Sequence, residues 1–135
     1  MYEKPFHLEI VTPERVVFQG EATSLTAPGV LGSFQILHSH APFLSAIGVG
    51  ELKVKSPDGA DTLYATGGGF VEVKENRVVV LAESAEAAAA IDVKRARAAR
   101  ERAEKRLRER EAVDIARAEA ALARAVNRLK VAERA

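Results

Sequence analysis

Apolar and polar residues alternate in short runs over the first two thirds of the chain. Residues 6–10 show the pattern clearly, since Phe6, Leu8 and Ile10 are separated by polar side chains, as in a half-buried strand. Similar runs recur as far as Ala82, and turn sequences such as Pro57-Asp58-Gly59 separate them. This rhythm is typical of a β-sandwich or barrel, and it predicts about ten short strands.

Two glycine-rich segments interrupt the strand pattern. Gly48-Val49-Gly50 is predicted to break one strand run, and Gly67-Gly68-Gly69 to bend the chain between two others. The second segment is not followed by the Lys-Ser/Thr and helix that a phosphate-binding loop needs, so we interpret it as a β-bend.

The pattern changes at residue 91, after which the chain contains neither glycine nor proline. The apolar period becomes helical, and it predicts helices over about 92–110 and 115–134, joined by residues 111–114. Asp92 and Asp114 are placed to cap their N-termini. We therefore expect an α+β protein, with a β-sandwich over residues 1–84 and an antiparallel two-helix hairpin over 85–135.

Alanine dominates the expected contact between the two helices. The apolar positions are Ala96, Ala99, Ala103 and Leu107 in the first helix, and Ile115, Ala118, Leu122, Ala125, Leu129 and Ala132 in the second. A buried Leu or Ile contributes about 1.5–3 kcal/mol, whereas an alanine methyl contributes nearer to about 0.8 kcal/mol. Stable helices joined by so weak a contact are expected to behave as a conformational switch.

Composition narrows the class of protein. Of the 135 residues, 47% are hydrophobic and 29% charged, as in a soluble globular protein. No apolar run approaches the roughly 20 residues of a membrane span, and residues 1–5 lack the features of a signal peptide. Cysteine is absent, so neither disulfides nor thiolate chemistry are available.

Charge is divided unevenly between the two expected domains. Residues 1–91 carry 6 Lys and Arg against 11 Asp and Glu, a net charge of −5, and residues 92–135 carry 14 against 8, a net charge of +6. A basic tail of this kind indicates a partner for the tail, such as the sandwich itself, an acidic protein surface, a phosphate ligand or nucleic acid.

The order of several motifs resembles the epsilon subunit of bacterial F-type ATP synthase over almost the whole chain. These motifs are the opening strand and turn at 8–13, the loop at 32–42, the strands at 68–73 and 78–82, Ile91-Asp92-x-x-Arg95-Ala96, and Asn127-Arg128-Leu129. The loop departs from the family pattern, because Gln35 stands where the family has glycine and His38 where it has proline.

The resemblance implies a non-catalytic rotor subunit at the cytoplasmic face of the bacterial inner membrane. It implies that the sandwich binds the gamma subunit of the central stalk and rests on the membrane rotor ring, with His40 at the ring contact. Ser33 stands where the family has an acidic residue that also faces the ring. The hairpin is expected either to fold against the sandwich or to extend into the alpha/beta catalytic head, where it obstructs ATP hydrolysis.

The resemblance also implies a regulatory ATP site on the folded hairpin, since some bacterial members bind ATP through the Ile/Leu-Asp-x-x-Arg-Ala motif. The matching residues are Glu86, Ile91, Asp92, Arg95, Ala96, Arg102, Arg124 and Arg128. Arginines at i, i+7 and i, i+4 spacing share helix faces, and their guanidinium groups can grip phosphate oxygens in pairs of hydrogen bonds.

Other interpretations remain open for the same residues. The arginines are also typical of a solvated helix face with Glu101, Glu104 and Glu109 as i, i+4 partners, and Asp92 is also explained by capping alone. The helices also fit a coiled-coil adaptor or a nucleic-acid-binding module, but no Phe, Tyr or Trp for base stacking occurs from Glu83 onward.

Metal binding and catalysis have little support in the sequence. His7, His38 and His40 are the only histidines, and we expect a hydrogen-bonded turn or a ring contact at 38–40 rather than a metal site. No nucleophile, base and orienting group converge in the sequence, so we predict a protein that is not an enzyme.

Overall fold

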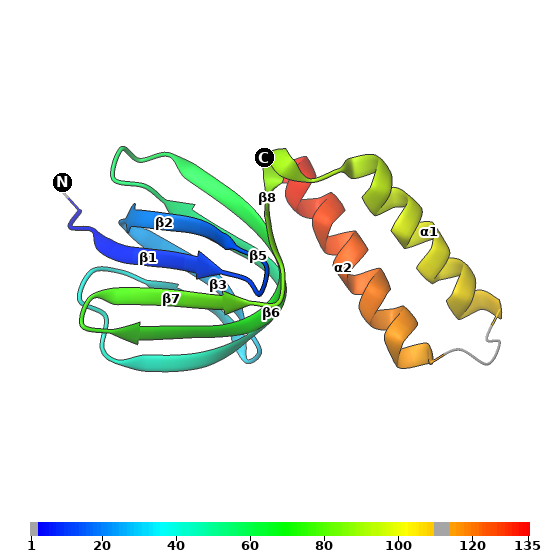
Figure 1. The fold of residues 1–135 in the computed structure, drawn as a ribbon, viewed down its shortest axis with the longest axis horizontal. Coiled ribbons are helices and arrows are strands. Elements are labelled where there is room, and N and C mark those ends of the chain that lie inside the picture. The colour runs from blue at the N-terminus through cyan, green and yellow to red at the C-terminus, as the bar shows by residue number, and fades with distance from the viewer. Residues whose placement is uncertain (1–2, 110–113) are drawn as a thin grey trace.

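The computed structural model describes residues 3–109 and 114–135, which form strands and then helices in the expected order. The elements are β1 (Phe6–Val11), β2 (Val16–Ala22), β3 (Ser24–Gly29), β4 (Gly32–Ile36), β5 (Phe43–Lys55), β6 (Asp61–Lys74), β7 (Arg77–Ala82), β8 (Ala85–Ala87), the short 3-10 helix η1 (Ala88–Ala90), α1 (Val93–Glu109) and α2 (Ile115–Arg134). Figure 1 shows a folded β-structure with a two-helix hairpin beside it. The predicted α+β class is confirmed.

All the described strands belong to one hydrogen-bonded system that folds over on itself. The strand order is β2-β1-β7-β6-β5-β3-β4, and β8 pairs with the first half of β6. Every pair is antiparallel except β1 with β7. The core between the layers is made of alternating inward side chains, among which Leu8, Ile10, Leu25 and Leu52 are fully buried.

The strands are longer and fewer than expected, because the two glycine-rich segments do not interrupt them. Eight strands are present in the described chain rather than about ten, because β5 continues through Gly48–Gly50 and β6 through Gly67–Gly69. The two segments face each other, with Ile47 opposite Gly69 and Val49 opposite Gly67. Gly69 has φ +142°, and a Cβ there would lie 2.0 Å from the carbonyl oxygen of Leu81. The glycines thus allow a continuous hairpin to bend and pass between layers.

The two helices have nearly the predicted bounds. Asp92 precedes α1 and its Oδ1 accepts a hydrogen bond from the Arg95 N–H over 3.0 Å. Asp114 caps α2 in the same way, through the Arg117 N–H at 3.2 Å. Both capping predictions are confirmed. The predicted end of the first helix at Arg110 and the connection at 111–113 lie outside the described residues.

The contact between the helices is as thin as expected. Its buried residues are Ala96 and Ala103 of α1 with Ala118 and Ala125 of α2. Ile115, predicted to be part of this contact, remains 50% exposed at the start of α2.

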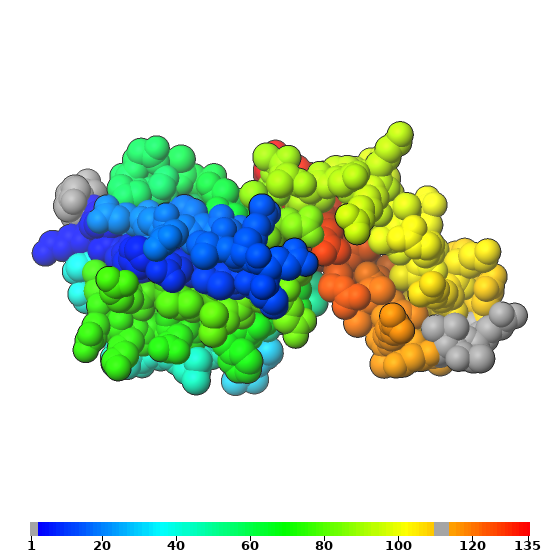
Figure 2. Space-filling model, viewed as in Figure 1, coloured from blue at the N-terminus to red at the C-terminus, as the bar shows by residue number. Residues whose placement is uncertain are grey.

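The hairpin meets the β-structure through α2. Val131 of α2 packs in a small cluster with Ala65 of β6 and Ile91. Figure 2 shows the two parts joined over a narrowed junction. Two large buried side chains contribute about 1.5–3 kcal/mol each, so apolar packing holds the hairpin only weakly.

Over residues 3–109 and 114–135, neither helix combines the length and the apolar character that a membrane crossing requires.

Candidate functional site

A surface cavity of about 310 Å³ lies where the first helix leaves the β-structure, and we name it the hairpin cavity. It is lined by Glu86, Ala90, Asp92, Arg95, Ala96, Ala99, Arg102 and Arg128. Six of these residues belong to the eight singled out in the sequence, and they come from β8, α1, the residue before α1, and α2. The cavity therefore exists only while the hairpin is folded against β8.

Helical periodicity brings the α1 residues of the cavity together. Arg95, Ala99 and Arg102 follow at i, i+4 and i+7, so they lie on one face of the helix. Ala96 is 4% exposed and belongs to the contact between the helices. The small side chains of Ala96 and Ala99 leave open space between the two arginines.

A charged pair closes the other side of the cavity. The Nε–H of Arg128 in α2 donates a hydrogen bond to Oε1 of Glu86 in β8 over 2.7 Å. Both side chains are half-buried. The pair orients Arg128 and leaves its remaining N–H groups available to a ligand.

Arg95 and Arg102 have no carboxylate within ion-pair distance among residues 3–109 and 114–135. Glu104 instead pairs with Arg100 over 2.7 Å, and Glu109 with Lys105 over 3.9 Å. Two of the glutamates that a solvated helix face would use are therefore paired with other cations. The cavity carries three guanidinium groups against two carboxylates, an arrangement that favours an anionic ligand.

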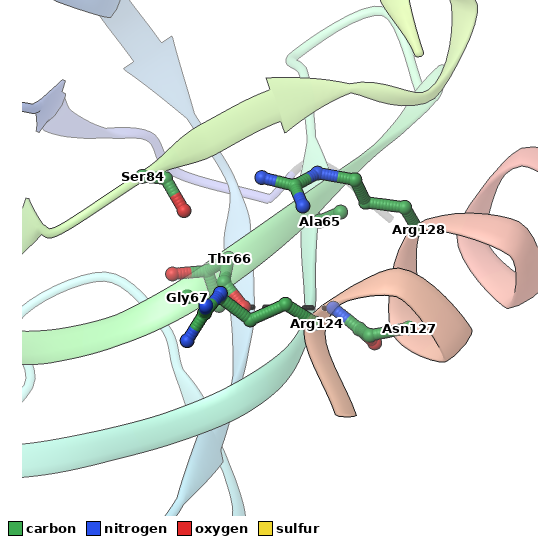
Figure 3. A pocket seen from close by; sticks show the side chains of 7 residues that line it. All are labelled: Ala65, Thr66, Gly67, Ser84, Arg124, Asn127 and Arg128. Atoms are coloured by element: carbon green, nitrogen blue, oxygen red, sulfur yellow. Dashed lines mark hydrogen bonds between the residues drawn. The ribbon is translucent and has the colours of Figure 1, made fainter. Parts of the chain in front are cut away.

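Two of the predicted site residues lie outside the cavity lining. Ile91 is 8% exposed and packs against Val131, so it belongs to the small apolar cluster between α2 and β6. Arg124 lines a separate small hollow with Arg128, Thr66, Gly67 and Ser84. Figure 3 shows the Arg124 side chain extending from α2 toward β6, close to Gly67.

Asn127 also lies beside this hollow and ties α2 to the β-structure. Its Nδ2 donates to the carbonyl oxygen of Gly50 over 2.7 Å and to that of Thr66 over 3.5 Å, the second bond being drawn in Figure 3. Near the C-terminus, Arg134 forms an ion pair with Glu51 over 3.3 Å. No spacing in the sequence predicts these contacts of Asn127, because its partners are backbone groups far away in the chain.

His40 lies in the loop between β4 and β5, at a distance in sequence from all these residues. Its Nδ1 hydrogen-bonds the carbonyl of Ala41 over 2.8 Å, and its ring packs edge-on against Phe43 with centroids 5.4 Å apart. His38 in the same loop hydrogen-bonds the carbonyl of Pro5 through Nδ1 over 2.9 Å. This is the hydrogen-bonded turn expected at 38–40.

A row of outward side chains forms a second surface of interest. Val16, Val11, Leu81, Phe70 and Ala46 are successive cross-strand neighbours over β2, β1, β7, β6 and β5. Val16, Leu81 and Phe70 are each more than half exposed. We name this surface the apolar row; contiguous exposed apolar side chains of this kind mark interaction sites.

Metal-binding groups are not assembled in the part of the chain that the structure describes. No cluster of three or more His, Asp or Glu side chains able to hold a metal ion occurs among those residues.

Family models match both parts of the chain. The model described as the beta-sandwich domain of the ATP synthase delta/epsilon chain matches residues 5–88, and the model of its long alpha-helix domain matches residues 89–133. Relatives described as ATP synthase epsilon chains include one from Syntrophomonas wolfei, 48% identical over 107 residues, which are 79% of this chain and 78% of the relative. Another, from Desulforamulus reducens, is 51% identical over 104 residues, covering 77% of this chain and 78% of the relative.

Solved structures share the fold at lower identity. A chain in the cryo-EM structure of the Euglena gracilis mitochondrial ATP synthase OSCP/F1/c-ring matches with a TM-score of 0.69 and 21% identity, covering 96% of this chain and 78% of that chain. A chain in the Tetrahymena thermophila central stalk and c-ring matches with a TM-score of 0.56 and 18% identity, covering 73% of this chain and 74% of that chain.

Proposed function

The chain belongs to the ATP synthase delta/epsilon chain family as a non-catalytic subunit, and on this premise we propose that its hairpin is an ATP-sensing brake on ATP hydrolysis. In this proposal ATP binds the hairpin cavity and favours the folded hairpin. Without ATP, the basic helices extend along the shaft into the alpha/beta catalytic head. The complex carries the chain at the cytoplasmic face of the bacterial inner membrane.

The observation that carries this proposal is the convergence of Arg95, Arg102 and Arg128 on one cavity. Its volume of about 310 Å³ lies at the lower end of the range for small-ligand pockets. Guanidinium forks are suited to phosphate oxygens, and the open space beside Ala96 and Ala99 is available to the rest of a nucleotide. Arg124, which lies in the neighbouring hollow, joins the site if its side chain turns around α2.

Binding at this position is coupled to folding of the hairpin. A ligand that contacts α1, α2 and β8 together binds only the folded arrangement, so it must shift the equilibrium toward that arrangement. At a ligand concentration 100 times the Kd the shift is worth about 2.7 kcal/mol. This free energy is similar in size to that of the apolar contact that holds α2. Millimolar nucleotide with a Kd in the micromolar range can therefore determine whether the hairpin is folded.

For the remaining partners we propose two surfaces of the sandwich. The apolar row is the surface for the gamma subunit, because its exposed apolar side chains are cross-strand neighbours on adjacent strands. The loop with His40 is the contact with the membrane rotor ring, as the family resemblance implies.

Isothermal titration of the isolated chain with ATP tests the nucleotide site. We expect one bound ATP, and we expect Arg95→Ala to weaken binding at least tenfold through loss of a charge-assisted contact worth about 1.5–3 kcal/mol. Arg97→Ala is the matched control, since Arg97 is in the same helix but lines a different hollow, together with Leu129 and Glu133. Absence of binding in the wild type, or equal weakening by both substitutions, would contradict the proposed site.

A further inference from the structure

The side-chain amide of Asn127 bridges two neighbouring strands from the docked helix. Gly50 of β5 and Thr66 of β6, whose carbonyl oxygens it contacts, are directly opposite each other in the β5–β6 pair. The contact with Gly50, at 2.7 Å, is among the shortest hydrogen bonds in the described chain, while that with Thr66, at 3.5 Å, is long. Asn127 itself is half-buried beside Val49 and Val126.

The β-structure is irregular at this point. β3 pairs with β5 at residues 24–26 and again at Gly29, but the register shifts between them. Pro28 lies in this interval and has no N–H to donate, and its Cβ would lie 2.5 Å from a Cβ placed on Gly50. The close approach of Pro28 leaves no room for a side chain at position 50, and Gly50 pairs with Thr66 of the neighbouring strand β6.

Among the described residues, the polar contacts between the hairpin helices and the strands come from α2 alone. Within residues 3–109 and 114–135 they are Asn127 with Gly50 and Thr66, Arg128 with Glu86, and Arg134 with Glu51. No side chain of α1 makes a hydrogen bond or ion pair with a strand in the same part of the chain. The two arginine pairs are solvent-accessible ion pairs, which are weak and screened by salt.

We propose that Asn127 is the latch that holds the hairpin folded, because its side-chain amide donates to the backbone carbonyl groups of Gly50 and Thr66 only while α2 is docked. This deepens the proposed function, since it rests on release of the hairpin, but it acts without nucleotide. The latch also sets the position of Arg128, the next residue, at the edge of the hairpin cavity. Loss of the latch therefore favours the released state and also lowers the apparent affinity of the cavity for its ligand.

Amide hydrogen exchange of the isolated chain, without nucleotide, tests the latch. Asn127→Leu keeps the branching and the number of side-chain heavy atoms and removes both N–H donors, and Asn127→Asp keeps the shape while placing a carboxylate against carbonyl oxygens. We expect exchange of the Ile115–Arg134 amides to accelerate about two- to tenfold in Asn127→Leu and further in Asn127→Asp, with β1 and β7 unchanged. Lys130→Ala is the control, as Lys130 is exposed on the same helix.

A distance measurement complements the exchange rates. The chain has no cysteine, so Ala60→Cys and Ala116→Cys, both at exposed alanines, give one spin-label pair between the β5–β6 turn and α2. We expect the population at the docked distance to fall in both Asn127 variants. Wild-type exchange rates together with a wild-type distance distribution in both variants would overturn the latch. That result would leave the ATP titration unaffected, so failure of the latch and failure of the nucleotide site are distinguishable.

Discussion

Oε1 of Glu86 lies 2.7 Å from Nε of Arg128, and this ion pair joins the last strand, β8, to the second helix. The residues are 42 positions apart in the chain, so the contact forms only when the hairpin lies against the β-structure. Glu86 also holds one edge of the guanidinium group that faces the hairpin cavity. Hairpin docking and the state of the cavity are therefore linked through one contact.

A double-mutant cycle with Glu86→Gln and Arg128→Gln measures this contact. We expect a coupling free energy of about 0.2–1 kcal/mol, because both side chains are partly solvent-accessible. The coupling should fall when the salt concentration rises to about 1 M, where the Debye length is about 3 Å. Urea unfolding followed by circular dichroism gives the four free energies. A coupling that is large and independent of salt would show that the pair behaves as a buried one.

Capping and ligand binding by Asp92 can be separated by two substitutions. Asp92→Ala removes the acceptor for the Arg95 N–H, and it should destabilise α1 by about 0.5–2 kcal/mol. Asp92→Asn retains a capping acceptor and should restore most of the helix stability. If the Asp92→Asn variant also binds ATP with wild-type affinity, Asp92 acts by capping alone. If the Asp92→Asn variant still binds ATP more weakly, the carboxylate contacts the ligand.

The bend of β6 depends on the absence of a side chain at Gly69. Gly69→Ala places a Cβ 2.0 Å from the Leu81 carbonyl oxygen at a φ of +142°, so the backbone must move. We expect a loss of at least about 1–3 kcal/mol of unfolding free energy. Gly48→Ala is the control, since a Cβ there meets no atom within 4 Å. Equal urea midpoints for the two variants would contradict this explanation of the continuous strand.

Binding of the chain to the gamma subunit should depend on the apolar row. Phe70→Ser and Leu81→Ser each remove a large side chain that is about half exposed, so the isolated chain should keep its fold. Each substitution at a buried interface centre should weaken binding by at least about 1–2 kcal/mol, measured by surface plasmon resonance against immobilised gamma. Val30→Ser, at an exposed residue in the β3–β4 turn outside the row, should have little effect. Equal affinities for all three variants would exclude the row as the interface.

The helix positions and the α1 side of the cavity were predictable from the sequence, for local reasons. Asp92 and Asp114 cap helices in segments free of glycine and proline, so the starts of both helices were found correctly. Arg95 and Arg102 meet because they share a helical face, which the spacing predicts. These features depend on residues within two turns of one another.

Features that depend on long-range packing were not predictable in the same way. Arg124 and Arg128 are i, i+4 neighbours, yet α2 lies against β6 such that Arg124 faces Gly67 while Arg128 reaches Glu86. The glycine segments were interpreted as breaks because their partner strand was unknown, and the facing glycines instead allow two strands to continue. The contacts of Asn127 depend on how α2 docks against β5 and β6, which no spacing in the sequence predicts.

Hydrogen exchange of the hairpin amides during ATP titration tests the central claim most directly. We predict that ATP slows exchange throughout Val93–Glu109 and Ile115–Arg134, saturating with the Kd found by calorimetry, and that Arg95→Ala abolishes the effect while Arg97→Ala retains it. Exchange rates in both helices that stay unchanged at saturating ATP would contradict the account, because a ligand that binds only the folded hairpin must protect it.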